Sequence, residues 1–139
     1  MNVGRSLAPV QIATENREES HTWVFKEENQ VAGRSGPVLT YLLSAHLKDL
    51  DVMNVPLHVE ESAVRTFLEA LEAIVLWKGR SARFEPSPDF LLTIDCFDST
   101  GHVKVETSFR NLLHGSRARI VFETDFSFVK IFLDGLSGR

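Results

Sequence analysis

Hydrophobic side chains recur with helical spacing in the middle of the chain. Steps of three and one residues separate them, which places them on one side of a helix. The positions are Val64, Phe67, Leu68, Leu71, Ile74 and Val75. Glu60 and Glu61 precede this stripe, where the helix dipole favours negative charge, and Gly79 follows it, where a left-handed residue commonly ends a helix. The pattern predicts a long amphipathic helix over residues 60–78.

Alternating hydrophobic and polar residues predict strands on both sides of this helix. Alternation covers residues 38–48, 52–59, 82–85, 90–96, 103–109 and 118–123, and shorter runs occupy 7–14 and 23–25. Short connections make neighbouring strands antiparallel. We therefore expect an α+β fold in which a mostly antiparallel sheet of about six strands is packed by the long helix.

A short C-terminal helix is expected over residues 126–136. Phe128, Phe132 and Leu136 supply its hydrophobic side, and Thr124 or Asp125 can cap its start. Between strands, the turn residues 98–101 predict a hairpin.

The length of 139 residues suits a single domain over residues 1–139. Residues 1–37 are its least regular part and include a loop at 32–37 with two glycines and a proline. We expect this part to be partly flexible. No internal repeat is visible along the chain.

Charge and composition narrow the classes of partner. The formal net charge is −4, and Lys and Arg are scattered, which opposes nucleic-acid binding and favours a basic protein partner. No apolar stretch approaches the ~20 residues that span a bilayer, and no signal peptide is visible, so we expect a cytoplasmic protein without a membrane. The single cysteine, Cys96, allows no internal disulfide.

No metal site is predicted. The five histidines are isolated from one another, without the close spacing typical of metal ligands. They are His21, His46, His58, His102 and His114. Asp95, Asp98, Gly101 and Glu106 partly match a calcium loop, but the glycine is one place late, and a hairpin explains all four residues.

Catalytic and cofactor sites are not predicted either. Cys96 falls on the inward face of a strand, where burial makes a thiol inert. The glycines of residues 33–36 flank one cation, Arg34, but lack the spacing of a phosphate loop, and Ser116 lacks the setting of a nucleophile elbow. Trp77 is either an anchor for a partner or a cap on one end of the core.

Several segments resemble the WapI family of bacterial immunity proteins over roughly residues 38–136. They are Phe67-Leu68-Glu69-Ala70-Leu71, Gly79-Arg80-Ser81-Ala82-Arg83-Phe84, Phe90-Leu91-Leu92-Thr93-Ile94, Gly101-His102-Val103-Lys104-Val105 and Phe122-Glu123-Thr124-Asp125. After the last segment the family has a Gln-Thr-Tyr-Leu type sequence, whereas this chain has Phe126-Ser127-Phe128-Val129. The resemblance implies a cytoplasmic, non-catalytic protein that neutralises a toxin by binding it, and it supplies no site residues.

Three hypotheses remain open. The first is an immunity-type protein that neutralises a toxin by direct contact, with a basic toxin domain as the candidate partner. The second is a ligand-binding or enzymatic domain with a pocket between the sheet and the 60–78 helix, which requires an enclosed cavity with converging polar groups. The third is an accessory subunit of a larger assembly, which an exposed apolar patch or an open edge strand would favour. The oligomeric state and the contact surface stay open.

Overall fold

The computed structural model describes residues 3–33, 36–47, 50–87, 90–110 and 117–138. Its elements follow one order twice: four strands and then a helix. The first set is β1 (Val10–Ala13), β2 (Ser20–Gln30), β3 (Pro37–Leu47), β4 (Leu50–Glu60) and α1 (Glu61–Val75). The second set is β5 (Ser81–Ser87), β6 (Phe90–Cys96), β7 (His102–Arg110), β8 (Arg117–Asp125) and α2 (Phe126–Ser137). The fold is α+β, as the sequence predicted.

The prediction of one sheet of about six strands is wrong. The strands form two four-stranded antiparallel sheets, in the orders β1-β2-β3-β4 and β5-β6-β7-β8. Helix α1 stands between β4 and β5 in the chain, and these two strands do not pair. The two sheets repeat one another in topology, although the sequence shows no repeat. Two sheets can share a topology when their strands have the same alternation of hydrophobic and polar positions. Different side chains can supply this alternation, so no sequence repeat is needed.

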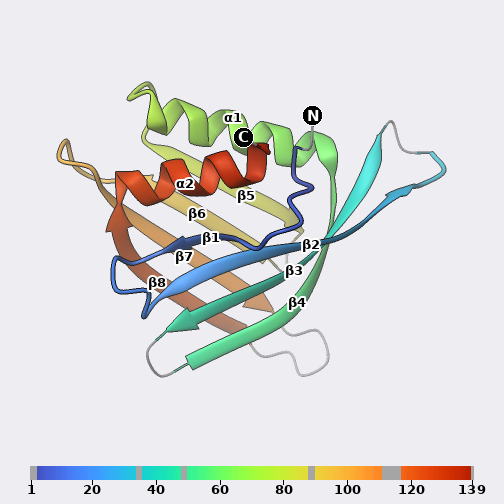
Figure 1. Ribbon diagram of the computed structural model, residues 1–139, viewed down its shortest axis with the longest axis horizontal. Coiled ribbons are helices and arrows are strands. Elements are labelled where there is room, and N and C mark those ends of the chain that lie inside the picture. Colours follow the sequence, from blue (N-terminus) through green and yellow to red (C-terminus); the bar gives the residue numbers. More distant parts are fainter. Residues whose placement is uncertain (1–2, 34–35, 48–49, 88–89, 111–116, 139) are drawn as a thin grey trace.

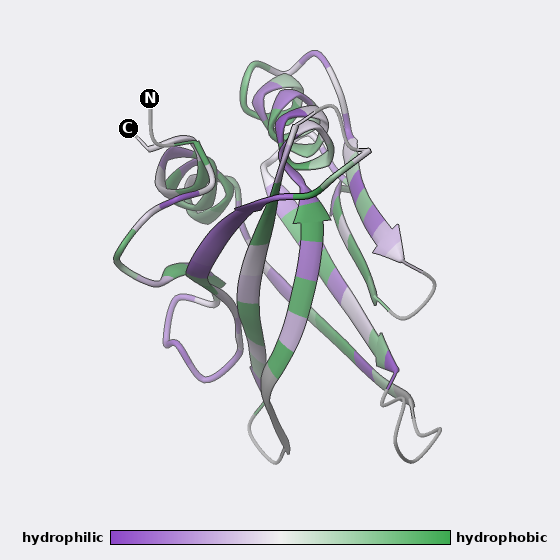
Figure 2. Ribbon diagram, turned by 90° about the vertical axis from the view of Figure 1, so that its right-hand side faces the viewer, coloured by the Kyte–Doolittle hydropathy of each residue, from purple (hydrophilic) through white to green (hydrophobic). Residues whose placement is uncertain are grey.

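Both helices lie side by side over one end of the two sheets (Figure 1). Helix α1 contacts mainly β5 and helix α2 contacts mainly β1, so each helix packs against the first strand, an edge strand, of the other half. Along the strands, hydrophobic and polar bands alternate, which marks an inner and an outer face of each sheet (Figure 2). None of the helices in the described ranges is long and apolar enough to span a membrane.

The strands at the N-terminal end differ in extent from those predicted. The run at 7–14 shortens to Val10–Ala13, whereas the run at 23–25 lengthens to Ser20–Gln30. A register shift between Phe25 and Glu27 breaks the alternation in the middle of β2, because a bulge turns the following side chains to the other face. The predicted pattern ends at Phe25 although the strand does not, because the side chains of residues 26–30 are all polar and exposed.

Helix α1 buries five of the six predicted stripe positions, Val75 being only partly buried. It begins at Glu61 and ends at Val75, within the predicted range 60–78. The prediction that Gly79 is the left-handed residue is wrong, since Trp77 holds that conformation with φ 59°. Gly79 is instead a point of close packing, because a Cβ there would lie 3.2 Å from Cβ of Ala73.

The core lies between both sheets and both helices. Trp23 on β2 is fully buried at its centre, and its ring contacts the rings of Tyr41, Phe67, Phe84 and Phe132. These four residues come from β3, α1, β5 and α2. One aromatic cluster therefore joins the two halves of the fold, and burial of each such ring contributes about 1.5–3 kcal/mol.

Candidate binding surfaces

The interior leaves no room for an enclosed active site between the sheets and α1 in the described part of the chain. Aromatic rings fill this space around Trp23, and most of the large core side chains are almost fully buried. The pocket hypothesis required an enclosed cavity at this place.

One ionisable side chain lies inside this core. His21 is fully buried, and burial lowers its pKa to about 3, so the imidazole is neutral at physiological pH. Its Nε2 accepts a hydrogen bond from Nε1 of Trp23 at 2.5 Å, and its ring stacks on Phe90. His21 packs among the rings of Trp23, Phe90, Phe109 and Phe132.

The acids that partly match a calcium loop do not converge. Asp98 accepts hydrogen bonds from the backbone N–H groups of Thr100 and His102, at 2.9 and 3.1 Å, which closes the predicted hairpin. Oε1 of Glu106 lies 2.6 Å from Nη2 of Arg119 on the neighbouring strand. Among the described residues, no group of three or more His, Cys, Asp or Glu side chains could hold a metal ion.

The remaining candidates from the sequence lie on different strands or outside the described residues. Cys96 is buried, as predicted, and its thiol donates to the carbonyl oxygen of Asp98 at 3.5 Å. His114 and Ser116, and Arg34 between its glycines, lie outside the described residues. His46 and His58 lie on β3 and β4.

Exposed aromatic side chains gather where α1 ends and α2 begins. The indole of Trp77 is 58% exposed and stacks on the ring of Phe126, with 4.6 Å between centroids and 9° between planes. Phe97, 50% exposed, stacks on His102 at the adjacent hairpin. The backbone N–H of Phe126 donates to Gly101 in that hairpin at 2.8 Å. We call these four side chains, Trp77, Phe126, Phe97 and His102, the aromatic end, which lies at the left in Figure 1.

The backbone of Trp77 is held in an unfavourable conformation. A φ of 59° is rare for a bulky residue and costs on the order of 1 kcal/mol. Hydrogen bonds fix this turn, because the N–H groups of Trp77 and Lys78 donate to Ile74 and Ala73 at 3.0 and 2.8 Å. In this backbone conformation, the large, half-exposed indole of Trp77 lies on the ring of Phe126. Such strained positions are frequent at functional sites.

Charge also marks the aromatic end. The carboxylate of Asp98 contacts Nδ1 of His102 at 2.6 Å, which raises the pKa of His102. Hydrogen bonds from Thr100 and then His102 lower the pKa of Asp98. Asp125 and Glu123 add to the negative field around His102. The exposed rings therefore have carboxylates beside them.

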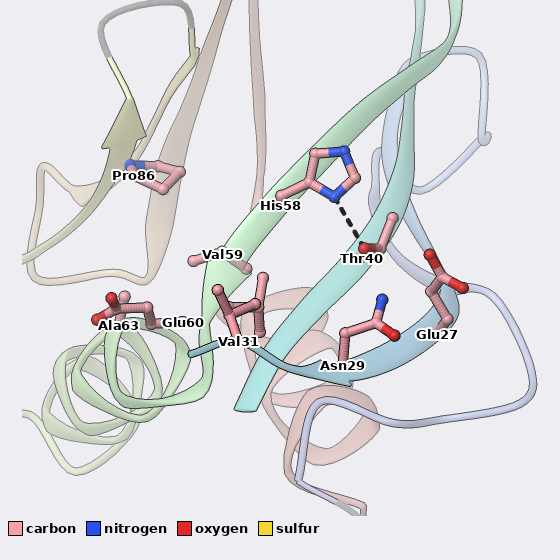
Figure 3. Close-up of a pocket in the computed structure, with 10 residues that line it drawn as sticks. Glu27, Asn29, Val31, Thr40, His58, Val59, Glu60, Ala63 and Pro86 are labelled. Atoms are coloured by element: carbon pink, nitrogen blue, oxygen red, sulfur yellow. Dashed lines mark hydrogen bonds between the residues drawn. The ribbon is translucent and has the colours of Figure 1, made fainter. Parts of the chain in front are cut away.

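A groove of about 610 Å³ lies where β2, β3 and β4 meet the first turn of α1 (Figure 3). Ten residues line it, and none of them is Lys or Arg: Glu27, Asn29, Val31, Val38, Thr40, His58, Val59, Glu60, Ala63 and Pro86. At one side of the groove, Oγ1 of Thr40 and Nδ1 of His58 share a hydrogen bond of 2.9 Å. The groove is thus acidic and partly apolar.

Sequence reasoning missed this groove. Glu27 and Glu60 are distant in the chain and each looks like an ordinary surface residue. Glu27 also follows the bulge in β2, beyond the end of the predicted strand. The residue that the sequence did indicate as a candidate anchor, Trp77, lies at the aromatic end and not at the groove.

No family model matches the chain, and no curated protein matches it. A solved structure described as "Crystal structures of trypanosoma bruciei MRP1/MRP2" is similar in fold, with a TM-score of 0.50 and 10% sequence identity. The match covers 93% of this chain and 79% of the other. At this identity the likeness shows a common arrangement of strands and helices, and it carries nothing further about either candidate surface.

Proposed function

We propose that this chain is a non-catalytic, cytoplasmic binding protein that neutralises a bacterial toxin by direct contact. The observation that carries the proposal is the indole of Trp77, which is half-exposed, held in a left-handed backbone conformation and stacked on Phe126. Tryptophan is among the residues most often dominant in protein interfaces, since a large rigid ring is buried at little entropic cost.

Two further features support this function. The resemblance of residues 38–136 to immunity proteins implies toxin binding without catalysis. The net charge of −4 favours a basic toxin domain, because complementary charge speeds association more than it deepens affinity. Asp98 and Asp125 beside the exposed rings would act in this way.

The test has two steps. The partner is first captured from the native host with the intact chain and identified, and it is then produced in bacteria alone and together with this chain. We expect the partner alone to arrest growth and co-production to restore it. Trp77→Ala should abolish the rescue. The matched control is Ile131→Ala, since Ile131 is a hydrophobic side chain that is 61% exposed on α2 and is not part of the aromatic end. A harmless partner, or rescue that survives Trp77→Ala, would contradict the proposal.

A second candidate function, binding of a small ligand, is favoured by the groove beside α1. Its volume of about 610 Å³ lies within the range of small-molecule pockets, ~300–1,000 Å³. The acidic lining would select a cation. A cationic small molecule that stabilises the chain against heat, with no dependence on any protein partner, would favour this candidate over toxin neutralisation.

A further inference from the structure

Strand β8 is an open edge of the second sheet. In the order β5-β6-β7-β8 it pairs with β7, and no second strand of the described residues pairs with it. The other edges are protected, because α1 packs on β5, α2 packs on β1, and β4 contains Pro56, which has no N–H group for a further strand. An open edge presents free N–H and C=O groups. Strand β8 is therefore the edge at which a further strand can pair.

The register of β7 and β8 tells which backbone groups of this edge are free. The N–H of Phe126 donates to the carbonyl oxygen of Gly101 at 2.8 Å, and this pair continues the register of the two strands. Every second pair of an antiparallel ladder is hydrogen-bonded. Counting back along the register, Ile120 and Phe122 are therefore bonded to β7. The groups that point to the open side belong to Arg119, Val121 and Glu123.

The same three residues carry a charge pattern that is complementary to itself. Arg119 and Glu123 are exposed, and Val121 between them is 37% exposed. When two β8 strands run antiparallel with Val121 opposite Val121 of a second copy, Arg119 of each chain lies opposite Glu123 of the other. Opposite charges in directly opposed positions stabilise a strand pair. A parallel pair in register would place arginine against arginine, so the pattern favours the antiparallel one.

The backbone fits the same antiparallel arrangement. Each residue that points its N–H and C=O groups to the open side meets another that does so, and the three pairs exchange about six hydrogen bonds. Oγ1 of Thr124 donates to the carbonyl oxygen of Ala13 at 2.5 Å, so β1 lies beside the end of β8, and the free stretch is residues 119–123. Arg119 contacts Glu106 through Nη2, and its guanidinium has two further nitrogen atoms that can donate.

We propose that the chain forms a two-fold symmetric homodimer in which the β8 strands of two copies pair antiparallel about Val121. The second sheets of the two copies, four strands each, then form one continuous sheet. The contact is short and buries less than the ~1,200 Å² of stable complexes, so we expect a dissociation constant on the order of 100 µM. This dimer goes beyond toxin neutralisation, because neither Trp77 nor the groove takes part in it.

Sedimentation equilibrium between about 10 µM and 1 mM chain tests the proposal. We expect the mass to rise from that of the 15.7 kDa monomer towards that of a dimer. Arg119→Glu and Glu123→Arg should each weaken the dimer about tenfold, because repulsion replaces attraction at both symmetric positions. An equimolar mixture of the two variants should recover the dimer, since two glutamates of one chain then face two arginines of the other.

Two control variants reverse exposed charges elsewhere. Glu69→Arg on α1 matches the charge change of Glu123→Arg, and Lys130→Glu on α2 matches that of Arg119→Glu. Both controls should leave dimerisation unchanged. Thermal unfolding of every variant verifies that it is folded.

Hydrogen exchange of the unmodified chain provides a test that needs no variant. The amides of Ile120 and Phe122 bond to β7 and should be protected at every concentration. The amides that point to the open side should exchange rapidly in dilute protein and become protected as the concentration rises. They are those of Arg119, Val121 and Glu123. This alternation along a single strand is specific to pairing at the edge.

Three results would overturn the proposal. The first is a chain that stays monomeric up to about 1 mM, which would leave the edge to a strand of another protein. The second is a dimer that the controls weaken as much as the β8 variants do, or that the mixture does not restore. The third is protection that appears on β4 and not at residues 119, 121 and 123. Because growth rescue is tested through Trp77, outside β8, the dimer and toxin neutralisation can fail separately.

Discussion

Nε1 of Trp23 donates a 2.5 Å hydrogen bond to Nε2 of His21, and both side chains are buried at the junction of the two sheets. The accepting nitrogen must lack a proton, so the bond requires a neutral imidazole. Phe90 and Phe109 of the second sheet lie against the His21 ring, with centroids 6.1 and 6.4 Å away. A charged imidazole would lose the bond and remain in an apolar environment.

We therefore expect stability to fall in mild acid because of His21. Its pKa is about 3 in the folded chain and about 6.5 when unfolded. Between these values the unfolded chain binds more protons, so stability is fully present above about pH 6.5 and decreases as pH falls towards 3. Within this window the loss approaches ~1.4 kcal/mol per pH unit. Urea unfolding at a series of pH values measures it.

The control for this prediction is His21→Gln, whose amide oxygen can still accept from Trp23 but does not titrate. We expect the variant to be less stable than the natural chain near neutral pH and to lose less of its stability between about pH 6.5 and pH 4. Parallel losses in both proteins would show that carboxylates elsewhere, and not His21, govern acid unfolding.

The local spacing of hydrophobic residues was sufficient to predict both helices. The stripe from Val64 to Ile74 identified α1, because each element buries one face and the spacing of that face is fixed by helix geometry. The end of the helix was not predictable in the same way. Gly79 fits the usual rule for a left-handed residue, but Trp77 takes that role, since its stack on Phe126 offsets part of the strain.

Strand pairing was not predictable from alternation. The pattern of β4 and β5 tells which side chains face inwards, and it does not tell whether these strands pair with each other. The answer depends on where α1 directs the chain. The core made of Trp23 and Phe84, which come from different sheets, likewise depends on contacts between distant segments.

The groove escaped prediction for a related reason. Its acids come from β2 and from the end of β4, and Glu27 lies beyond the end of the predicted strand at 23–25, after the bulge that follows Phe25. A bulge depends on pairing with the neighbouring strand, so a single strand's sequence does not reveal it. Trp77, by contrast, was identified as a candidate because it lies at the end of the long predicted helix.

Replacement of Trp77 should separate its strain from its stacking. Both Trp77→Gly and Trp77→Ala lose the contact with Phe126, worth about 0.5–1.5 kcal/mol. Only glycine adopts a φ of 59° without steric cost. We expect Trp77→Gly to be more stable than Trp77→Ala by about 0.5–1 kcal/mol in chemical unfolding. If Ala is the more stable variant, the turn has relaxed and the strain depends on the indole itself.

The pKa of His102 should depend on Asp98. Hydrogen bonding and charge from Asp98 raise the pKa of His102. Its stabilising effect is present below the unfolded pKa of about 6.5 and is lost as pH rises through the higher folded value. We expect NMR titration to give His102 a pKa above that of an unfolded histidine, and Asp98→Asn to lower it. An unchanged His102 pKa in the variant would show that Asp125 and Glu123 dominate instead.

Gly135 of α2 approaches β1 so closely that a Cβ atom there would lie 2.8 Å from Cγ1 of Val10. Alanine favours a helix by about 1 kcal/mol over glycine, so Gly135→Ala would stabilise an isolated helix. Here we expect the opposite, a loss of about 1–2 kcal/mol, because the β-branched Val10 cannot turn aside without strain. The double variant with Val10→Ala removes the clashing methyl groups. Chemical unfolding of both single variants and the double variant should give a coupling of more than about 0.5 kcal/mol in favour of the double variant. Additive losses would mean that α2 shifts as a unit away from β1, and that the packing between the C-terminal helix and the first strand is looser than the contact at Gly135 implies.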